Sequence, residues 1–204
     1  MGITFNTVAA ICGNFSIEST VNPGIYEGKN VIAPADMTDN TVYGGYGLGQ
    51  WTNGVFDWGT LTRRTNLINY LDANNYAWDD GCGQLDFLLY EDYWVQNVGE
   101  YATLQDFLNN QESDINRLTY IWMRNWEGIY NSTISSRRKF ARNVVSYLVQ
   151  HFDDTNISTW VSMNDYLGTA DMKNNSVLIC RYLMNGQRPK YKKKMPLWMY
   201  TRKV

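Results

Sequence analysis

At residues 14–19 the chain reads Asn-Phe-Ser-Ile-Glu-Ser, and one loop later, at residues 44–51, it reads Gly-Gly-Tyr-Gly-Leu-Gly-Gln-Trp. The first stretch places a carboxylic acid, Glu18, near the end of an apolar segment with helical periodicity. The second combines four glycines with aromatic and amide side chains, which suits turns and the close approach of a ligand. We therefore expect a mainly α, α+β fold, in which a helical body and a short β-hairpin or loop lobe form a cleft.

Hydrophobic periodicity predicts most of the other elements. The first helix is expected at residues 7–21, with Thr7 capping its start and Asn-Pro-Gly at residues 22–24 ending it. Residues 25–52 lose the helical period, and we expect loops there with a short hairpin around Val31 and Val42. Further helices are predicted at residues 61–74, at 82–98, from a capping pair at Thr103 and Asp106, from Ser113, at 135–152 and at 176–184.

Size and composition limit the organisation and the kinds of site. The 204 residues suit one substantial domain with an appendage, and we place the boundary after residue 152, so that residues 153–204 form a C-terminal extension. The three cysteines are far apart and are expected to be buried thiols. A single histidine, His151, leaves little for a metal site or a Ser-His-Asp triad, and we expect no metal and no cofactor.

The basic residues are unevenly distributed. Residues 186–204 hold seven Lys or Arg and no acid, whereas the rest of the chain holds 11 basic against 20 acidic residues. Such a tail suits an anionic polymer such as wall teichoic acid, and a plain solvated terminus fits the pattern equally well. The main domain lacks aromatic–basic interleaving, so we expect no specific nucleic-acid binding. We also find no secretory signal and no bilayer-spanning run, and expect synthesis in a cytoplasm.

Glu18 is the strongest candidate for chemistry. It shares a helix flank with Ile11, Asn14 and Phe15, so its surroundings are expected to be half apolar. Burial against that flank and the negative end of the helix dipole both favour the protonated carboxyl. A carboxyl that holds its proton near neutral pH can protonate a leaving glycosidic oxygen. A solvent-facing glutamate is the alternative, and for Glu18 taken alone it would be preferred.

The glycine-rich segment shifts the balance toward a sugar-binding cleft. Tyr46, Gln50 and Trp51 offer ring stacking and amide hydrogen bonds to a saccharide. Trp51 fits a core position beneath the cleft equally well. Phosphate binding is the competing interpretation of the alternating glycines, but their spacing misses the dinucleotide fingerprint and we expect no strand, turn and helix around them.

These motifs resemble the phage tail lysozyme family, whose domains lie in tail-tip proteins that open bacterial peptidoglycan. The family shares a Gly-Asn helix with Glu-Ser near its end, then Asn-Pro-Gly, then a glycine-rich segment ending in Gln-Trp-Thr. Here the resemblance extends over residues 8–152 and lies in Gly13, Asn14, Glu18, Ser19, residues 22–24 and 45–52, Arg63, Arg64, and residues 84–91 and 125–128. The first two motifs are also similar to those of soluble lytic transglycosylases and goose-type lysozymes, which rely on a single glutamate.

The resemblance implies a lysozyme-like fold and cleavage of peptidoglycan between N-acetylmuramic acid and N-acetylglucosamine. It implies that Glu18 is the general acid, that Ser19 orients this acid or the substrate, and that Gln50 and Tyr46 hold the acetamido sugar. Water would complete a hydrolysis, whereas the sugar's own 6-hydroxyl would complete a transglycosylation that leaves an anhydro end. The sequence leaves both open.

The resemblance also implies a virion component at the tail tip, made in the host cytoplasm, with other tail proteins as partners. A tail-tip protein that keeps the fold for assembly or wall adhesion, without activity, is the rival from another class.

A second carboxylate is not assigned by the sequence. Glu27, Asp36 and Asp39 lie in the expected loop lobe, and Glu127 is a further candidate for the cleft. A buried glutamate that ties helices together is an equally good interpretation of Glu127. The separation of the two carboxyl groups would decide between retaining and inverting outcomes.

Family members usually have a further amphipathic helix ahead of the Gly-Asn helix, which we do not expect in this chain. The stretch at residues 176–184 has a comparable apolar pattern. We therefore predict that it packs against the first helix in place of the missing one.

Overall fold

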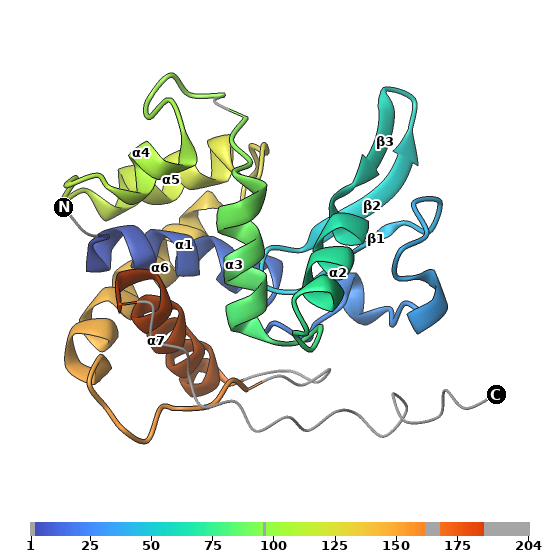
Figure 1. Ribbon diagram of the computed structural model, residues 1–204. Helices are drawn as coiled ribbons and strands as arrows, with labels where there is room; N and C mark the ends of the chain where they lie inside the picture. Colours follow the sequence, from blue (N-terminus) through green and yellow to red (C-terminus); the bar gives the residue numbers. More distant parts are fainter. Residues whose placement is uncertain (1–2, 96, 162–167, 186–204) are drawn as a thin grey trace.

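The computed structural model describes residues 3–95, 97–161 and 168–185 (Figure 1). This part of the chain is mainly helical with a small antiparallel sheet, so the predicted fold class is confirmed. The helices are α1 (Phe5–Glu18), α2 (Arg63–Ala73), α3 (Gly81–Glu91), α4 (Leu104–Leu108), α5 (Ile115–Asn125), α6 (Ile134–His151) and α7 (Thr169–Asn185). The strands are β1 (Gly44–Tyr46), β2 (Trp51–Phe56) and β3 (Gly59–Thr62), preceded by the 3-10 turns η1 (Glu27–Lys29) and η2 (Pro34–Asp36).

Helix α1 is the central element of the helical lobe. Figure 1 shows it surrounded by α5, α6 and α7, all three of which contact it. The helix begins at Phe5 because the side chain of Thr4 accepts a hydrogen bond from the backbone N–H of Thr7, so the predicted cap at Thr7 is wrong. It ends at Glu18, three residues before the predicted end, with Ser19 as the C-cap.

The predicted hairpin around Val31 and Val42 is also wrong. The sheet begins instead in the glycine-rich segment, where β1 pairs with β2 from Gly44↔Asn53 to Tyr46↔Trp51, and β2 then pairs with β3. The strands and α2 form a second lobe, which lies beside the helical lobe with α3 between them (Figure 1).

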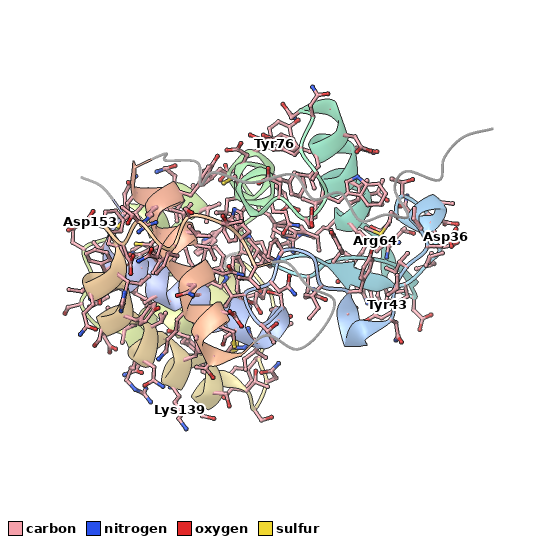
Figure 2. The ribbon with its side chains drawn as sticks, turned by 90° about the horizontal axis from the view of Figure 1, so that it is seen from below. Asp36, Tyr43, Arg64, Tyr76, Lys139 and Asp153 are labelled. Atoms are coloured by element: carbon pink, nitrogen blue, oxygen red, sulfur yellow. The ribbon has the colours of Figure 1, made fainter. Side chains whose placement is uncertain are left out.

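Arg64 fixes the loop that precedes the sheet. Its buried guanidinium donates hydrogen bonds to backbone carbonyls, which belong to Asp36, Met37, Asp39, Val42 and Gly44. Figure 2 shows Arg64 among this loop, with Asp36 and Tyr43 near it at the end of the molecule remote from Lys139 on α6. Backbone carbonyls that would accept hydrogen bonds from a neighbouring strand in a hairpin accept them here from the Arg64 side chain.

The other predicted helices are present with shifted ends. The capping box of Thr103 and Asp106 is confirmed at the start of α4. Helix α5 starts after an Asp114 cap rather than at Ser113. Helix α3 stops at Glu91, well before the predicted residue 98, because Asp92 adopts the left-handed backbone conformation with φ of 44°.

The prediction that residues 176–184 pack against the first helix is confirmed. Helix α7 contacts both α1 and α6, and its Val177, Leu178 and Ile179 are fully buried in the same hydrophobic core as α1. The Asn175 side chain adds a hydrogen bond to the carbonyl of Val21 at 2.8 Å. The proposed domain boundary after residue 152 stays a prediction. Helix α7, which lies beyond this boundary, shares a hydrophobic core with residues 1–152.

The three cysteines, Cys12, Cys82 and Cys180, are free and buried, as predicted. Burial raises the pKa of the Cys12 thiol to about 12, which leaves it protonated and unreactive. The basic residues 186–204 lie outside the described residues. Within the described ranges, no helix has both the length and the hydropathy needed to cross a bilayer.

Candidate active site

A cleft of about 410 Å³ opens between the helical lobe and the β lobe, a size usual for ligand sites. Glu18 enters it from the end of α1, and Glu127 enters it from the segment that follows α5. The β lobe and the start of α2 supply other parts of the lining, which include Gly49, Gln50, Thr52, Trp58, Leu61 and Arg63. Two carboxyl groups therefore meet in one concave site.

Arg137 of α6 joins these two carboxyl groups. Its Nη2 forms an ion pair with Glu18, and its Nη1 lies 2.7 Å from Oε2 of Glu127. The side chain of Arg137 is 1% exposed, that of Glu127 is 5% exposed and that of Glu18 is 23% exposed. Glu18 is thus the member of the group that a ligand in the cleft reaches most easily. The flank expected for Glu18 lacked a charged partner, and the structure adds one, because α6 brings the buried guanidinium of Arg137 to this carboxyl group.

The environment of Glu127 favours a retained proton. Burial raises the pKa of Glu127 well above 4.5, the negative charge of Glu18 raises it further, and Arg137 opposes both. Its Oε1 is buried and finds no hydrogen-bond donor among the described residues. A proton on Glu127 would let this oxygen donate to Glu18. Because one guanidinium cannot neutralise two carboxylates, the pair is suited to carry one proton between them.

Gly13 and Asn14 hold Arg137 in place. Oδ1 of Asn14 accepts a hydrogen bond from Nη1 of Arg137 at 3.0 Å, while its Nδ2 donates to the carbonyls of Ala10 and Thr119. A Cβ at Gly13 would lie 2.6 Å from the carbonyl oxygen of Arg137, so only glycine lets α6 approach α1 this closely. The Gly13–Asn14 pair of the sequence motif therefore positions Arg137: Gly13 lets α6 come close, and Asn14 binds the guanidinium.

Sequence reasoning missed Arg137. The one signal available is its spacing, because Arg137, Ala141, Val144 and Leu148 form the buried stripe of α6. An arginine at a core position of an amphipathic helix needs buried hydrogen-bond acceptors, which are either backbone carbonyls, as for Arg64, or an anion. The partner itself, Glu18, lies 119 residues away in the sequence.

Gln50 and Ser19 lie where the glycine-rich segment meets the end of α1. Gln50 lines the cleft, and its Nε2 donates to the carbonyls of Ile25 and Gly47. Ser19 is buried, and its hydroxyl donates to the carbonyl of Leu48 at 2.8 Å. Ser19 thus fastens the helix that carries Glu18 to the glycine-rich segment.

Tyr46 and Trp51 are buried and lie outside the described lining of the cleft. The ring of Tyr46 packs against Tyr26 at 4.9 Å between centroids. Trp51 packs edge-on against Trp126 at 5.7 Å, and its indole N–H donates to Glu91. Of the two interpretations of Trp51, the structure shows the core position beneath the cleft.

Two glycines of the glycine-rich segment, Gly47 and Gly49, make room for buried side chains of the protein. Gly47 has a positive φ of 79°, and a Cβ there would lie 2.5 Å from Oε1 of Gln84. A Cβ at Gly49 would overlap the ring of Trp126. These glycines were predicted to let a ligand come close to the backbone. At Gly47 and Gly49 the groups that come close are instead the side chains of Gln84 and Trp126.

The remaining carboxylates of the loop lobe are engaged elsewhere. Glu27 accepts hydrogen bonds from the backbone N–H of Gly45 at 2.8 Å and from the hydroxyl of Tyr43. Asp36 lines a separate pocket together with Glu27, and Asp39 binds Thr41. Among the four predicted candidates for a second carboxylate, the structure brings Glu127 to Glu18.

A family model described as phage tail lysozyme matches residues 1–148. The chain belongs to the phage tail lysozyme family. This membership supports a peptidoglycan-lytic enzyme as the kind of activity and a phage as the context. Morphogenesis protein 1 of Bacillus phage B103 is similar as well, with 28% identity over 130 residues. That match covers 62% of this chain and 30% of the relative, so the chain spans less than a third of the relative's length.

The rim of the cleft carries aromatic residues that the sequence did not single out. Trp58, in the turn between β2 and β3, is 71% exposed and stacks on Phe56 with 4.9 Å between centroids and 9° between planes. Tyr93 also lines the cleft, and the Arg63 guanidinium lies 4.0 Å from its ring centre and 4.8 Å from that of the buried Trp126. This phage tail lysozyme family member therefore has a charged centre and an aromatic rim, and in the described ranges it has no His, Cys, Asp and Glu cluster suited to a metal.

Proposed function

We propose that the protein cleaves the glycan strand of bacterial peptidoglycan between N-acetylmuramic acid and N-acetylglucosamine. The observation that carries the proposal is the arrangement of Glu18, Arg137 and Glu127 in the cleft. Burial and the neighbouring charge of Glu18 raise the pKa of Glu127 and so favour a proton on this pair. General-acid cleavage of a glycosidic bond requires such a proton. Membership of the phage tail lysozyme family supports the substrate.

In the proposed mechanism Glu18 is the general acid, because it is the more exposed of the two carboxyl groups in the cleft. Glu127 and Arg137 are positioning residues: Glu127 lies beside Glu18 and shares its proton, and Arg137 orients both carboxyl groups. Glu18 gives the proton to the leaving glycosidic oxygen as the bond from that oxygen to C1 breaks. Positive charge then develops at C1, and the carboxylate that remains faces it.

The second half of the reaction has two versions. Water adds to C1 in the hydrolytic version, and its proton returns to the carboxylate pair, which leaves a reducing end. In the transglycosylase version the 6-hydroxyl of the same sugar attacks C1 and gives up its proton to the pair, which leaves an anhydro end. The described lining of the cleft holds acids only at Glu18 and Glu127, both bound to Arg137, and this favours the single-glutamate chemistry common to both versions.

The predicted substrate contacts of Ser19, Tyr46, Gln50 and Trp51 are revised in this proposal. Gln50 is kept as a cleft residue. Ser19, Tyr46 and Trp51 are buried and act by holding the walls of the cleft in position.

We place the activity in a phage particle, as a tail-associated enzyme that opens the cell wall and has other tail proteins as partners. The similarity to a phage morphogenesis protein supports this context. Binding of an anionic wall polymer by residues 186–204 is a separate part of the proposal. A pull-down of the full chain and of a chain lacking residues 186–204, on walls with and without teichoic acid, tests it.

Digestion of purified peptidoglycan, followed by mass spectrometry of the released muropeptides, tests the proposed function. Reducing muramic ends would establish a lysozyme, and anhydro ends would establish a transglycosylase. Muropeptides that are cut only in the peptide, or no release at all from a folded protein, would contradict the proposal. No release would favour a tail protein that uses the fold for assembly or adhesion.

A further inference from the structure

A second depression of about 850 Å³, the α2–α3 groove, is lined by residues of α2 and α3. Its lining includes Asn66, Asn69 and Asn74 from and just after α2, Tyr70 of α2 and Tyr90 of α3. The volume is within the range usual for ligand sites. The proposed mechanism does not use this groove.

The groove offers aromatic faces next to amide groups. Tyr90 is 72% exposed, and its ring centre lies 4.9 Å from that of Tyr70, which is itself 5.5 Å from Phe87. The rings are therefore held in position before any ligand arrives. The exposed amides of Asn66 and Asn69 make no hydrogen bond to other described residues. Rings with amides beside them bind the apolar face and the polar edge of a sugar ring.

The charge of the groove argues for a neutral ligand. Its lining contains one ionisable acid, Glu91, and the carboxylate of this residue is bound by Arg63 through Nε at 2.7 Å and Nη2 at 2.8 Å. An anionic polymer would find no free cation in this lining. Acetamido sugar rings are neutral, so a chain of them can bind without a cation in the lining.

The α2–α3 groove lies next to the cleft. Arg63, Asn66 and Tyr70 follow one another at helical spacing along a single stripe of α2. Arg63 lines the cleft, while Asn66 and Tyr70 line the groove. The Arg63–Glu91 ion pair is thus the border between the two, with one partner in each lining.

We propose that the α2–α3 groove is a saccharide-binding site that holds the glycan strand where it extends past the cleft across the Arg63–Glu91 pair. The identity of this saccharide rests on the proposed function. A site of this kind binds long strands in preference to short ones, and so helps the protein stay on the wall without taking part in the cleavage step.

The test measures binding of Glu18→Gln protein to insoluble peptidoglycan, with and without Tyr90→Ala in the same chain. Removing an exposed stacking ring should weaken binding about threefold to tenfold. Tyr130→Ala is the matched control, because Tyr130 is a tyrosine of nearly the same exposure, 71%, outside both linings. Asn69→Ala provides a second probe of the groove. The changes at Tyr90, Asn69 and Tyr130 should leave the melting temperature of the Glu18→Gln protein unchanged, since these three side chains are exposed.

Kinetics with an otherwise wild-type chain separate this proposal from the proposed function. Tyr90→Ala should raise KM on long glycan strands severalfold, leave kcat unchanged, and leave both constants unchanged on oligosaccharides short enough to occupy the cleft alone. Unchanged binding by Tyr90→Ala and Asn69→Ala, or an equal loss with Tyr130→Ala, would overturn the groove as a saccharide site. Full activity of Glu18→Gln together with weaker binding by Tyr90→Ala would remove the proposed catalytic role and leave the groove standing.

Discussion

Arg137 sets the charge of the candidate active site, because its buried guanidinium is shared by Glu18 and Glu127. A buried cation with no anion would be costly, and two anions around one cation would also be costly if neither kept a proton. The raised pKa of Glu127 favours one proton on this carboxylate pair. Glu18, the more exposed of the two carboxyl groups, lines the cleft.

The pH dependence of stability tests this charge state. The pKa of Glu127 is raised above 4.5, so between pH 4.5 and this raised pKa the folded protein holds a proton that the unfolded chain has released. The free energy of unfolding must then fall as pH rises through that window, by at most about 1.4 kcal/mol per pH unit for one proton. Glu127→Gln removes this titration and should flatten the fall, as measured by urea denaturation at a series of pH values. Parallel curves for the wild type and the variant would show that Glu127 does not retain its proton.

The exposed ring of Trp58 gives a second prediction at this scale. Trp58→Ala removes a surface that the stack on Phe56 holds at the cleft rim, and loss of one sugar–ring contact of about 1 kcal/mol should raise KM for peptidoglycan fragments about fivefold. Val55→Ala is the control, because Val55 is 62% exposed on the same hairpin and does not line the cleft. Steady-state kinetics with unchanged melting temperatures check this, and equal KM values for all three proteins would exclude a substrate contact at Trp58.

Individual site residues were predictable to different degrees. Glu18 could be placed from the sequence because its position depends on the local period of one helix. Arg137 could not, because its role arises only when α6 crosses α1. Tyr46 was expected to contact the sugar, and Trp51 was left open between a sugar contact and a core position. Both rings are buried in the core, where their apolar faces are removed from water.

At the scale of elements, the crossing of α1 and α6 determines whether Arg137 reaches Glu18. Gly13 permits this crossing, since a Cβ there would lie 2.8 Å from Cβ of Ala141 as well as against the backbone of Arg137. Gly13→Ala should therefore lower the free energy of unfolding by about 1–3 kcal/mol and reduce activity by displacing Arg137. Thermal unfolding and peptidoglycan digestion measure both effects.

Gly99→Ala is the control for this prediction, because a Cβ at Gly99 would have open space around it. It should change the free energy of unfolding by about 0.5 kcal/mol or less. Equal stability of the two variants would show that the contact at Gly13 does not limit how closely the helices approach.

Helices were easier to predict than strands in this chain. Most helices follow from an apolar period of 3.6 residues, and only their ends depend on caps such as Thr4 and Asp114. Strand β1 is three residues long with two glycines, so it has no alternating pattern to detect. Its pairing with β2 comes from tertiary structure, including the carbonyls that Arg64 binds.

At the scale of the whole molecule, the packing of α7 bears on where the folded domain ends in the sequence. Its Val177, Leu178 and Ile179 are fully buried in the core shared with α1. Each such side chain stabilises the fold by about 1.5–3 kcal/mol, and together they approach the whole stability of an ordinary domain, about 5–15 kcal/mol. A chain ending at Phe152 should therefore lose cooperative unfolding and near-ultraviolet circular dichroism.

Val149→Ala in the full chain is the control for this truncation, because it removes an exposed methyl-bearing side chain of α6 and should leave the melting temperature unchanged. A chain ending at Phe152 with the melting temperature of the full protein would contradict the prediction. It would instead support a self-sufficient domain of residues 1–152.

In the proposed function Glu18 supplies the proton that breaks the glycan strand. Release of muropeptides from purified peptidoglycan by Glu18→Gln, measured by mass spectrometry against the wild type, tests this role. Asp36→Asn is the matched control, since Asp36 lines a different pocket. We predict a loss of at least about 10²-fold for Glu18→Gln with an unchanged melting temperature, and near-wild-type release for Asp36→Asn. Equal release by Glu18→Gln and the wild type would contradict this role.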